Sequence, residues 1–318
     1  MIEFSIIIPH YNIPDLLMRC LQSIPVREDI QVIVVDDCSK DADQYVQRYP
    51  ALSRPYLEFY STSKGGSAGR ARNVGLDHAE GKWLLFADAD DFFVENLGEI
   101  LDSNKDSTAD VIFFRKLSVM SDDITKAATR SGWSDQIIDN YFRTRNDLEI
   151  RRSYAAPWGK MIRRKLVVDN DIRFDETRYS NDFYFSAFVG CVAGEIAVMD
   201  YPIYVVTVRE GSLASGVLDK PNELKERSDV AFRVQELLQR HGYPVDLELL
   251  ASYSYRIYKT EESLVGAYLD RVSTLKISSW MIFKEILHLL KERQSPRKML
   301  WMGAGLKKRS IQRCLGIH

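Results

Sequence analysis

The acids Asp88, Asp90 and Asp91 directly follow an apolar run at residues 83–87. Hard divalent cations such as Mg²⁺ and Mn²⁺ bind carboxylate oxygens, usually one or two from the protein together with phosphate oxygens. The cluster therefore has the ligands for a metal that bridges a diphosphate. A turn that caps the next helix explains the same acids without any chemistry. The same spacing recurs without a preceding apolar strand, and there indicates solvated acids, at residues 41–43 and 169–171.

A second pair of acids, Asp36 and Asp37, follows an apolar run at residues 30–35. Helix signals separate the runs: one opens at Asn12 and Pro14, and one covers residues 67–79. Strands separated by helices predict a mostly parallel sheet covered on both faces. Ligands bind beyond the carboxyl ends of such strands, where both acid clusters lie. The predicted strands are residues 4–9, 30–35, 56–60, 83–87 and 111–114.

The composition limits the class of protein. The chain has 318 residues, 45% of them hydrophobic, and a net charge of −2, so we expect no nucleic-acid partner. Its four cysteines form neither a Cys-x-x-Cys pair nor a disulfide framework. We find no signal peptide and no apolar stretch of the about 20 residues that span a bilayer. These features predict a cytoplasmic protein.

The last part of the chain is basic and predicted to be helical. Helices are expected from Pro221 onward and over residues 247–272 and 275–293. Residues 276–313 contain ten Lys or Arg and two Glu. A basic amphipathic helix would lie on the inner face of an anionic membrane. A helical cap on the preceding domain or a homodimer contact explains the pattern as well, and we favour these because apolar helix faces usually pack in a core.

Four segments in register, residues 4–12, 34–39, 69–75 and 86–91, read FSIIIPHYN, VVDDCS, GRARNVG and FADADD. Together they resemble the family-2 glycosyltransferases. The resemblance implies an α/β GT-A fold, a Rossmann-like, mostly parallel sheet with flanking helices, followed by a helical C-terminal extension. It implies a glycosyltransferase domain over residues 1–218, with a nucleotide-sugar-binding half (1–115) and an acceptor-side half (116–218). Residues 219–318 form the helical region.

The resemblance also implies roles on the donor side. Pro9 and Tyr11 would line the pocket for the nucleobase and ribose, and Asp37 would read the edge of the base, commonly uracil. Asp36 would support the turn. Arg72 would face the donor, because a helix N-terminus with a nearby Arg favours phosphate. A solvated Arg on the helix surface is the alternative.

The acid cluster would contact the ribose through Asp88 and a Mn²⁺ or Mg²⁺ ion through Asp90 and Asp91, although the sequence does not apportion the metal ligands. Arg209, in a looser match, would approach the donor diphosphate. A structural salt bridge is an equally good interpretation of Arg209.

On the acceptor side, residues 158–164 resemble a segment that packs near the acceptor, and Asp182 matches the catalytic base. Asn181 departs from the Glu that is common at its position. The resemblance implies inverting transfer from a nucleotide-sugar donor, commonly UDP-linked, to a hydroxyl of a glycan or lipid-linked acceptor in bacterial polysaccharide synthesis. It needs no catalytic cysteine or histidine. The alternatives are a sugar nucleotidyltransferase, which residues 9–12 disfavour, and an inactive nucleotide- or glycan-binding module, which the intact acids disfavour.

Overall fold

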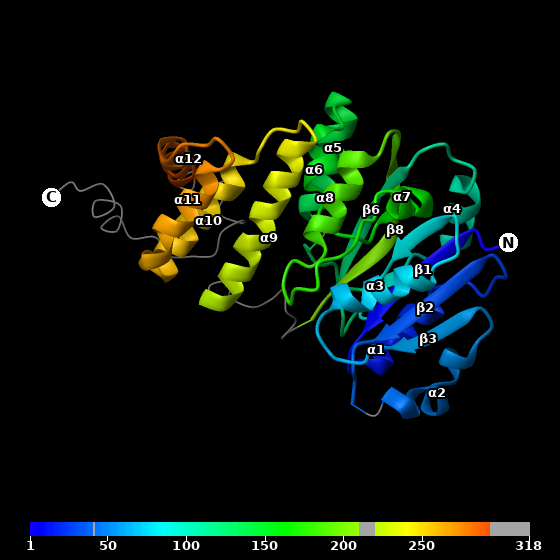
Figure 1. Cartoon of the computed structure of the whole chain (residues 1–318). Helices are drawn as coiled ribbons and strands as arrows, with labels where there is room; N and C mark the ends of the chain where they lie inside the picture. Colours follow the sequence, from blue (N-terminus) through cyan, green and yellow to red (C-terminus); the bar gives the residue numbers. More distant parts are fainter. Residues whose placement is uncertain (41, 131, 210–219, 293–318) are drawn as a thin grey trace. The chain divides into compact units, whose positions relative to one another are not determined.

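A computed structural model describes residues 1–40, 42–130, 132–209 and 220–292 (Figure 1). The chain divides into two compact units between Val245 and Asp246. This division lies beyond the domain boundary expected after residue 218. The reason is that helix α9 (Pro221–Arg240) packs Val234, Leu237 and Leu238 around Ala187 of helix α8 (Phe183–Val192) and so belongs to the first unit.

The first unit is built on one mixed sheet with the strand order β3-β2-β1-β4-β7-β6-β8-β5. The first four strands in this order pair in parallel, whereas β7 is antiparallel to both of its neighbours. Strand β8 is parallel to β6 and antiparallel to β5. The bounds are β1 (Phe4–His10), β2 (Ile30–Asp36), β3 (Leu57–Ser61), β4 (Trp83–Phe86), β5 (Phe92–Phe93), β6 (Val111–Met120), β7 (Lys160–Arg163) and β8 (Ile196–Val208). The five predicted strands are confirmed, and β5, β7 and β8 are additional.

Alternating side chains bury both faces of β1. Ile6 and Ile8 belong to one core cluster together with Leu17 of helix α1 (Pro14–Gln22). Ile7 belongs to the cluster on the other face together with Ala71 of helix α3 (Ala68–His78). This two-sided burial explains the continuous apolar run. It also fixes the carboxyl ends of β1, β2 and β4 at one edge of the sheet.

The remaining helices flank the sheet or form the second unit. In the first unit they are α2 (Tyr45–Arg48), α4 (Leu97–Asn104), α5 (Gly132–Thr144), α6 (Leu148–Ser153) and α7 (Arg164–Asp169). The second unit contains α10 (Leu247–Thr260), α11 (Val265–Ser273) and α12 (Ser279–Glu292). The helix expected over residues 247–272 is two helices, because Glu261 leaves the helical conformation and a short 3₁₀ turn, Glu262–Leu264, follows it.

The second unit bears on the expected membrane contact. Within the described ranges, no helix has the length and hydrophobicity to cross a bilayer. Trp280 and Met281 of α12 are exposed. Most of the basic residues in question lie outside the described part of the chain, which ends at residue 292.

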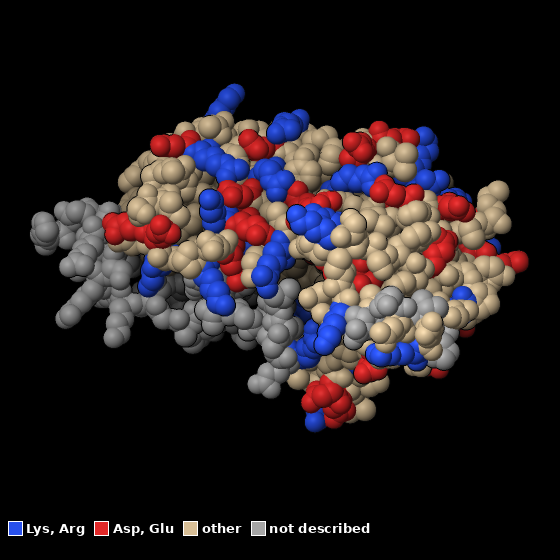
Figure 2. Space-filling model, turned by 60° about the horizontal axis from the view of Figure 1, so that its bottom comes forward, with Lys and Arg blue, Asp and Glu red and all other residues tan. Residues whose placement is uncertain are grey.

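The surface carries both signs of charge. On the face shown in Figure 2, Lys and Arg side chains are interspersed with Asp and Glu side chains. This mixture agrees with the net charge of −2. Extended polyanion-binding surfaces are instead dominated by positive charge.

Candidate active site

The turn after β2 is held by a buried contact between His10 and Asp36. The Nδ1 atom of His10 lies 2.8 Å from Asp36 Oδ1, and the backbone N–H of Ile13 donates to His10 Nε2 at 3.2 Å. Since Nε2 accepts, the proton is on Nδ1 and is donated to Asp36. Burial alone would raise the pKa of Asp36, but hydrogen bonds from His10 and Ser39 hold it below its ordinary value. His10 therefore has a structural role that its sequence context did not reveal.

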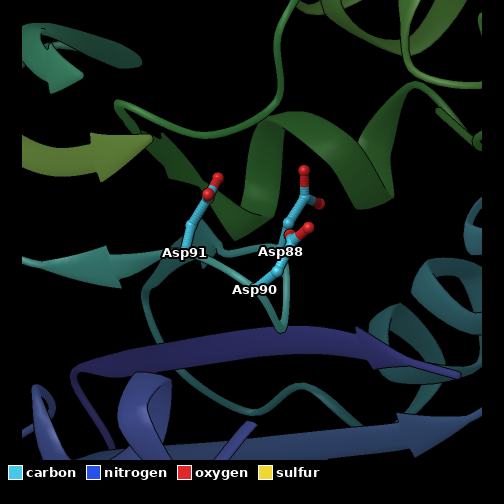
Figure 3. Close-up of side chains that lie close together, drawn as sticks. All are labelled: Asp88, Asp90 and Asp91. Carbon is cyan, nitrogen blue, oxygen red and sulfur yellow. The ribbon is translucent and has the colours of Figure 1, made fainter. Parts of the chain in front are cut away.

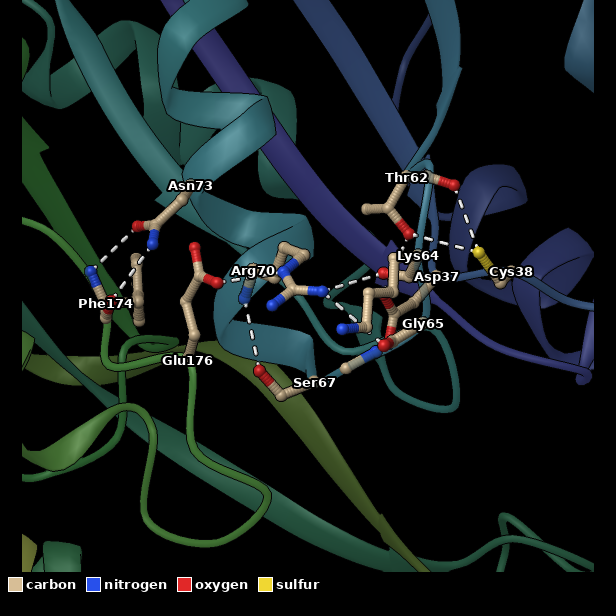
Figure 4. A network of polar contacts seen from close by, with 11 residues as sticks. Asp37, Cys38, Thr62, Lys64, Gly65, Ser67, Arg70, Asn73, Phe174 and Glu176 are labelled. Carbon is tan, nitrogen blue, oxygen red and sulfur yellow. Dashed lines mark hydrogen bonds and ion pairs between the residues drawn. The ribbon is translucent and has the colours of Figure 1, made fainter.

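Asp37 joins the end of β2 to the loop that precedes α3. Its carboxylate is buried and accepts hydrogen bonds from Thr62 Oγ1 and from the backbone N–H of Gly66, each at 3.0 Å (Figure 4). Pro9 is buried at the end of β1, and the Tyr11 side chain just beyond it is 58% exposed. These three residues lie at the edge of the sheet where the nucleobase is expected.

Arg72 of α3 is a buried bridge and not a solvated surface residue. Its guanidinium donates to Asp88 Oδ1 at 2.6 Å and to Asn181 Oδ1 at 2.8 Å, and it lies over the ring of Phe174. The side chain of Arg72 is 5% exposed. It connects the strand end that carries the acid cluster to the segment that carries Asp182.

Two aromatic residues, one in the loop before β7 and one in β8, also hold Asp88. Trp158 donates from Nε1 to Asp88 Oδ2 at 3.1 Å, and the backbone N–H of Asp88 donates to the hydroxyl of Tyr204 at 2.8 Å. The two rings stack with centroids 5.5 Å apart. Both carboxylate oxygens of Asp88 are thus occupied, and its orientation is fixed.

Three carboxylates meet on the turn after β4 (Figure 3). One oxygen each of Asp88, Asp90 and Asp91 lies within 4.8 Å of the others. Asp91 Oδ1 accepts from the backbone N–H of Thr207 at 2.6 Å, whereas its buried Oδ2 has no hydrogen bond among the described residues. Burial, and then repulsion by Asp88 and Asp90, raise the pKa of Asp91 well above its ordinary value.

This cluster fits a divalent cation. Burial and Asp88 also raise the pKa of Asp90, and Arg209 opposes the shift. Burial and mutual repulsion both disfavour the ionised forms of Asp90 and Asp91, and a bound cation would relieve that repulsion. The unsatisfied oxygen of Asp91 is a free ligand atom in a set of hard oxygen donors, which Mg²⁺ and Mn²⁺ prefer.

Two arginines contact Asp90. Arg209 Nε lies 3.4 Å from Asp90 Oδ2 with its side chain 41% exposed. This contact is compatible both with a salt bridge and with an approach to the donor. Arg19 of α1 donates to the backbone oxygen of Asp90 at 2.6 Å and fixes the turn, a role that the helical pattern of α1 does not indicate.

Asp182 lies at the N-terminus of α8, next to the arginine bridge. Its side chain is half-buried, and none of the described residues outside its own backbone is hydrogen-bonded to its carboxylate. Burial raises the pKa of Asp182; Arg72 and Lys160 oppose this rise, and Asp88 adds to it. A carboxylate with a raised pKa and free acceptor oxygens is suited to take up a proton.

Lys160 of β7 is a buried lysine in the half of the domain that is expected to bind the acceptor. It donates to the backbone oxygen of Tyr154 at 2.8 Å and lies over the Tyr154 ring. Burial lowers the pKa of Lys160 to about 7, and Asp182 opposes the shift. The family resemblance of residues 158–164 predicted packing near the acceptor, but it gave no indication that the pKa of Lys160 is lowered.

A family model described as "Glycosyl transferase family 2" matches residues 5–169. The poly(ribitol-phosphate) beta-N-acetylglucosaminyltransferase TarS of Staphylococcus aureus is 29% identical over 234 residues, which are 71% of this chain and 39% of TarS. The succinoglycan biosynthesis protein ExoO of Rhizobium meliloti is 26% identical over 222 residues, which are 67% of this chain and 62% of ExoO. The chain thus spans about two fifths of TarS and less than two thirds of ExoO.

A solved structure has the same fold. The crystal structure of S. aureus TarS residues 1–349 in complex with UDP-GlcNAc superposes with a TM-score of 0.66 at 20% identity, and the match covers 92% of each chain. The α/β fold expected from the sequence is therefore confirmed.

Proposed function

The chain belongs to glycosyl transferase family 2, and we propose on this basis that it transfers a sugar from a UDP-linked donor to a hydroxyl group of a glycan or lipid-linked acceptor. The observation that carries the proposal is the bridge through Arg72, which joins Asp88 of the acid cluster to Asn181 next to Asp182. The names of TarS and ExoO support a bacterial glycan as the acceptor class.

On the donor side, we assign Pro9, Tyr11 and Asp37 to the nucleobase and ribose pocket, Asp88 to the ribose, and the other two acids of the cluster to a metal ion at the diphosphate. Asp37 keeps a fixed orientation through Thr62 and Gly66, as hydrogen bonding to a base requires. Asp90 and Asp91 would hold a Mn²⁺ or Mg²⁺ ion, which supplies the counter-charge for the diphosphate. Arg72 keeps Asp88 aligned beside them, and Arg209 lies where it would contact the phosphates.

The transfer itself needs one base. The Asp182 carboxylate takes the proton from the acceptor hydroxyl while the acceptor oxygen bonds to the anomeric carbon. The bond from that carbon to the diphosphate oxygen breaks, and its electron pair leaves with UDP. A single displacement inverts the anomeric centre. Among the described residues, only its own backbone is hydrogen-bonded to the Asp182 carboxylate, so the carboxylate keeps acceptor positions for this proton.

A thermal-shift screen of UDP, GDP and dTDP with Mn²⁺ tests the donor class, because a ligand that binds only the native form raises its melting temperature. We expect UDP to give the largest rise, and the rise to require Mn²⁺. Slow Mn²⁺-dependent hydrolysis of a UDP-sugar then separates an enzyme from an inactive binding module. A larger shift with GDP, or binding without hydrolysis, would contradict the assignment.

We also propose a cytoplasmic setting, in which the basic C-terminal region forms a helical cap or a homodimer contact, as its pattern favours, with contact to an anionic membrane as the alternative. Exposed Trp280 and Met281, with the Lys284 ammonium over the Trp280 ring, are compatible with the membrane alternative. Flotation with anionic liposomes, with and without the residues after Ser295, tests that alternative. Light scattering of the same two proteins would detect the homodimer contact.

A further inference from the structure

The loop at residues 175–182, which ends at Asp182, is fastened to α3 and α9. From α9, Arg233 donates two hydrogen bonds to the carboxylate of Asp175, at 2.7 and 2.9 Å. From α3, Asn73 exchanges two hydrogen bonds with the backbone of Phe174. The backbone of α3 approaches so closely that a methyl group on Gly69 would lie 1.9 Å from the oxygen of Asp175. The start of this loop therefore has little freedom.

The middle of the loop has a different connection, which leads to the donor side. Arg70 of α3 donates from Nε to Glu176 Oε2 at 2.9 Å (Figure 4). Its Nη1 atom donates to the backbone oxygen of Lys64 at 2.9 Å. The next residues, Gly65 and Gly66, lie against the same guanidinium, and Gly66 donates its N–H to Asp37. One side chain thus contacts both the loop that holds Asp37 and the loop that ends at Asp182.

A displacement of Glu176 would reach Asp182 through the backbone of the loop. The N–H of Asp175 donates to the oxygen of Asn181 at 3.1 Å, and the Asn181 side chain donates to the oxygen of Thr177 at 3.2 Å. These bonds close the loop on itself. The residue next to Asp182 therefore moves together with the residues that flank Glu176.

We propose that Arg70 is a positioning residue that couples occupation of the donor loop at Asp37 to the placement of the Asp182 carboxylate. The inference rests on the proposed roles of these two acids. The planar guanidinium holds its donors in fixed directions, which a lysine does not. The Arg70 and Glu176 side chains are 29% and 46% exposed, so the pair contributes little stability alone. Such a contact would form or tighten when a ligand orders one of its ends.

The chain offers a matched control. Arg173 Nη1 lies 2.6 Å from Asp77 Oδ1, so this pair also joins α3 to the segment before Asp182. Asp77 lies near the C-terminus of α3, whereas Arg70 is in its first turn beside the donor loop. The control side chains are 47% and 55% exposed. Loss of this pair removes a similar surface contact but leaves the connection to Asp37 intact.

Amide hydrogen exchange at residues 175–182, measured with and without UDP and Mn²⁺, tests the coupling directly. We expect UDP to slow exchange about fivefold or more in the wild type and in Arg173→Ala. An effect of about fivefold is the lower end of the range that is typical of coupling between two binding sites. In Glu176→Gln this protection should disappear, while the Kd for UDP from calorimetry stays within about twofold of the wild type. Arg70→Lys should also lose the protection, as Glu176→Gln does, because a lysine ammonium does not hold several N–H donors in the fixed directions of the guanidinium.

The kinetics of UDP-sugar hydrolysis give a second readout. Glu176→Gln should lower kcat about fivefold and leave KM unchanged, and Arg70→Ala should alter both, because it also frees the donor loop. Equal UDP-induced protection in Glu176→Gln and the wild type, or an equal loss in Arg173→Ala, would overturn the inference. Calorimetry on the wild type is done first. A failure of UDP to bind would refute the proposed donor. UDP binding without slower exchange at residues 175–182 would instead refute only the proposed coupling.

Discussion

Replacing Asp182 with Asn tests the proposed base and separates chemistry from stability. The amide has the shape of the carboxylate but cannot accept the acceptor proton. General-base catalysis contributes about 10²–10⁴-fold, so kcat should fall by that factor, equivalent to about 3–5 kcal/mol in the barrier. UDP binding should persist, because Asp182 is outside the proposed nucleoside contacts.

The same substitution should not destabilise the chain. Since burial raises the pKa of Asp182 above its ordinary value, its ionised form is less favourable in the folded chain than in the unfolded one at neutral pH. Removing that charge should leave the free energy of unfolding unchanged or increase it, a combination typical of functional residues.

The measurement pairs urea unfolding with UDP-sugar hydrolysis for Asp182→Asn and for Asp169→Asn as a control. Asp169 is exposed, and its one ion pair among the described residues is with Lys165, one helical turn earlier, so its variant should match the wild type in both assays. Hydrolysis near the wild-type rate in Asp182→Asn would refute the assignment of the base. A large loss of stability would show that the acid is structural.

Three further predictions concern the surroundings of this base. Asp91→Asn relieves repulsion in the acid cluster, so the melting temperature without metal should rise. Its Mn²⁺ affinity, measured by calorimetry, should fall at least about 10–100-fold, which is the loss typical of residues that only support a metal ligand. The pKa of Lys160 is about 7 when folded and about 10.4 when unfolded, so only the unfolded chain is protonated between these values and stability should rise with pH there. In melting scans at pH 7 and 10, Lys160→Met should remove the rise in melting temperature between the two pH values. The same rise in the variant and the wild type would show that Lys160 is not its source. Gly69→Ala should cost about 3 kcal/mol or more in urea unfolding, because its methyl group would collide with the Asp175 oxygen, and a neutral effect would show that the loop can move away.

The donor half was largely predictable from the sequence, because its elements follow one another along the chain. Its buried strands are mainly apolar, with Ser5 and Gln31 as buried polar exceptions, and the acids at the strand ends stand where the α/β pattern places ligands. The expected bounds of α3 differ from the observed ones by one residue at each end, since Ser67 caps the helix and Ala79 ends it. The secondary structure of this half therefore follows from residues that are close together in the sequence.

The second half follows from contacts between distant residues, and these leave little periodicity. Strand β7 has four residues and contains the buried Lys160, which its apolar neighbours do not indicate. Strand β8 is irregular where it passes Arg115 of β6, with a register shift opposite Pro202. Its burial therefore does not alternate cleanly, and the period-2 signal is lost.

The roles of individual polar residues depend on the same distant contacts. Arg72 was expected near the donor, but its bond to Asn181 joins residues 109 positions apart. Asn181 in place of the common Glu gives a neutral acceptor for this guanidinium. The use of His10 as a donor to Asp36 depends on Ile13 occupying the other ring nitrogen. Single-residue motifs carry no information on such pairings.

The support of the acid cluster has a consequence for biosynthesis. Asp91 is fixed by Thr207, 116 positions later, and the short strand β5 pairs only with β8 among the described strands. A nascent chain can therefore assemble strands β1 to β4 while the partner of its Asp91 is still untranslated. The carboxylate cluster therefore reaches the arrangement seen in the structure only after Thr207 of β8 has been synthesised, so its geometry depends on one of the later long-range pairings of the sheet.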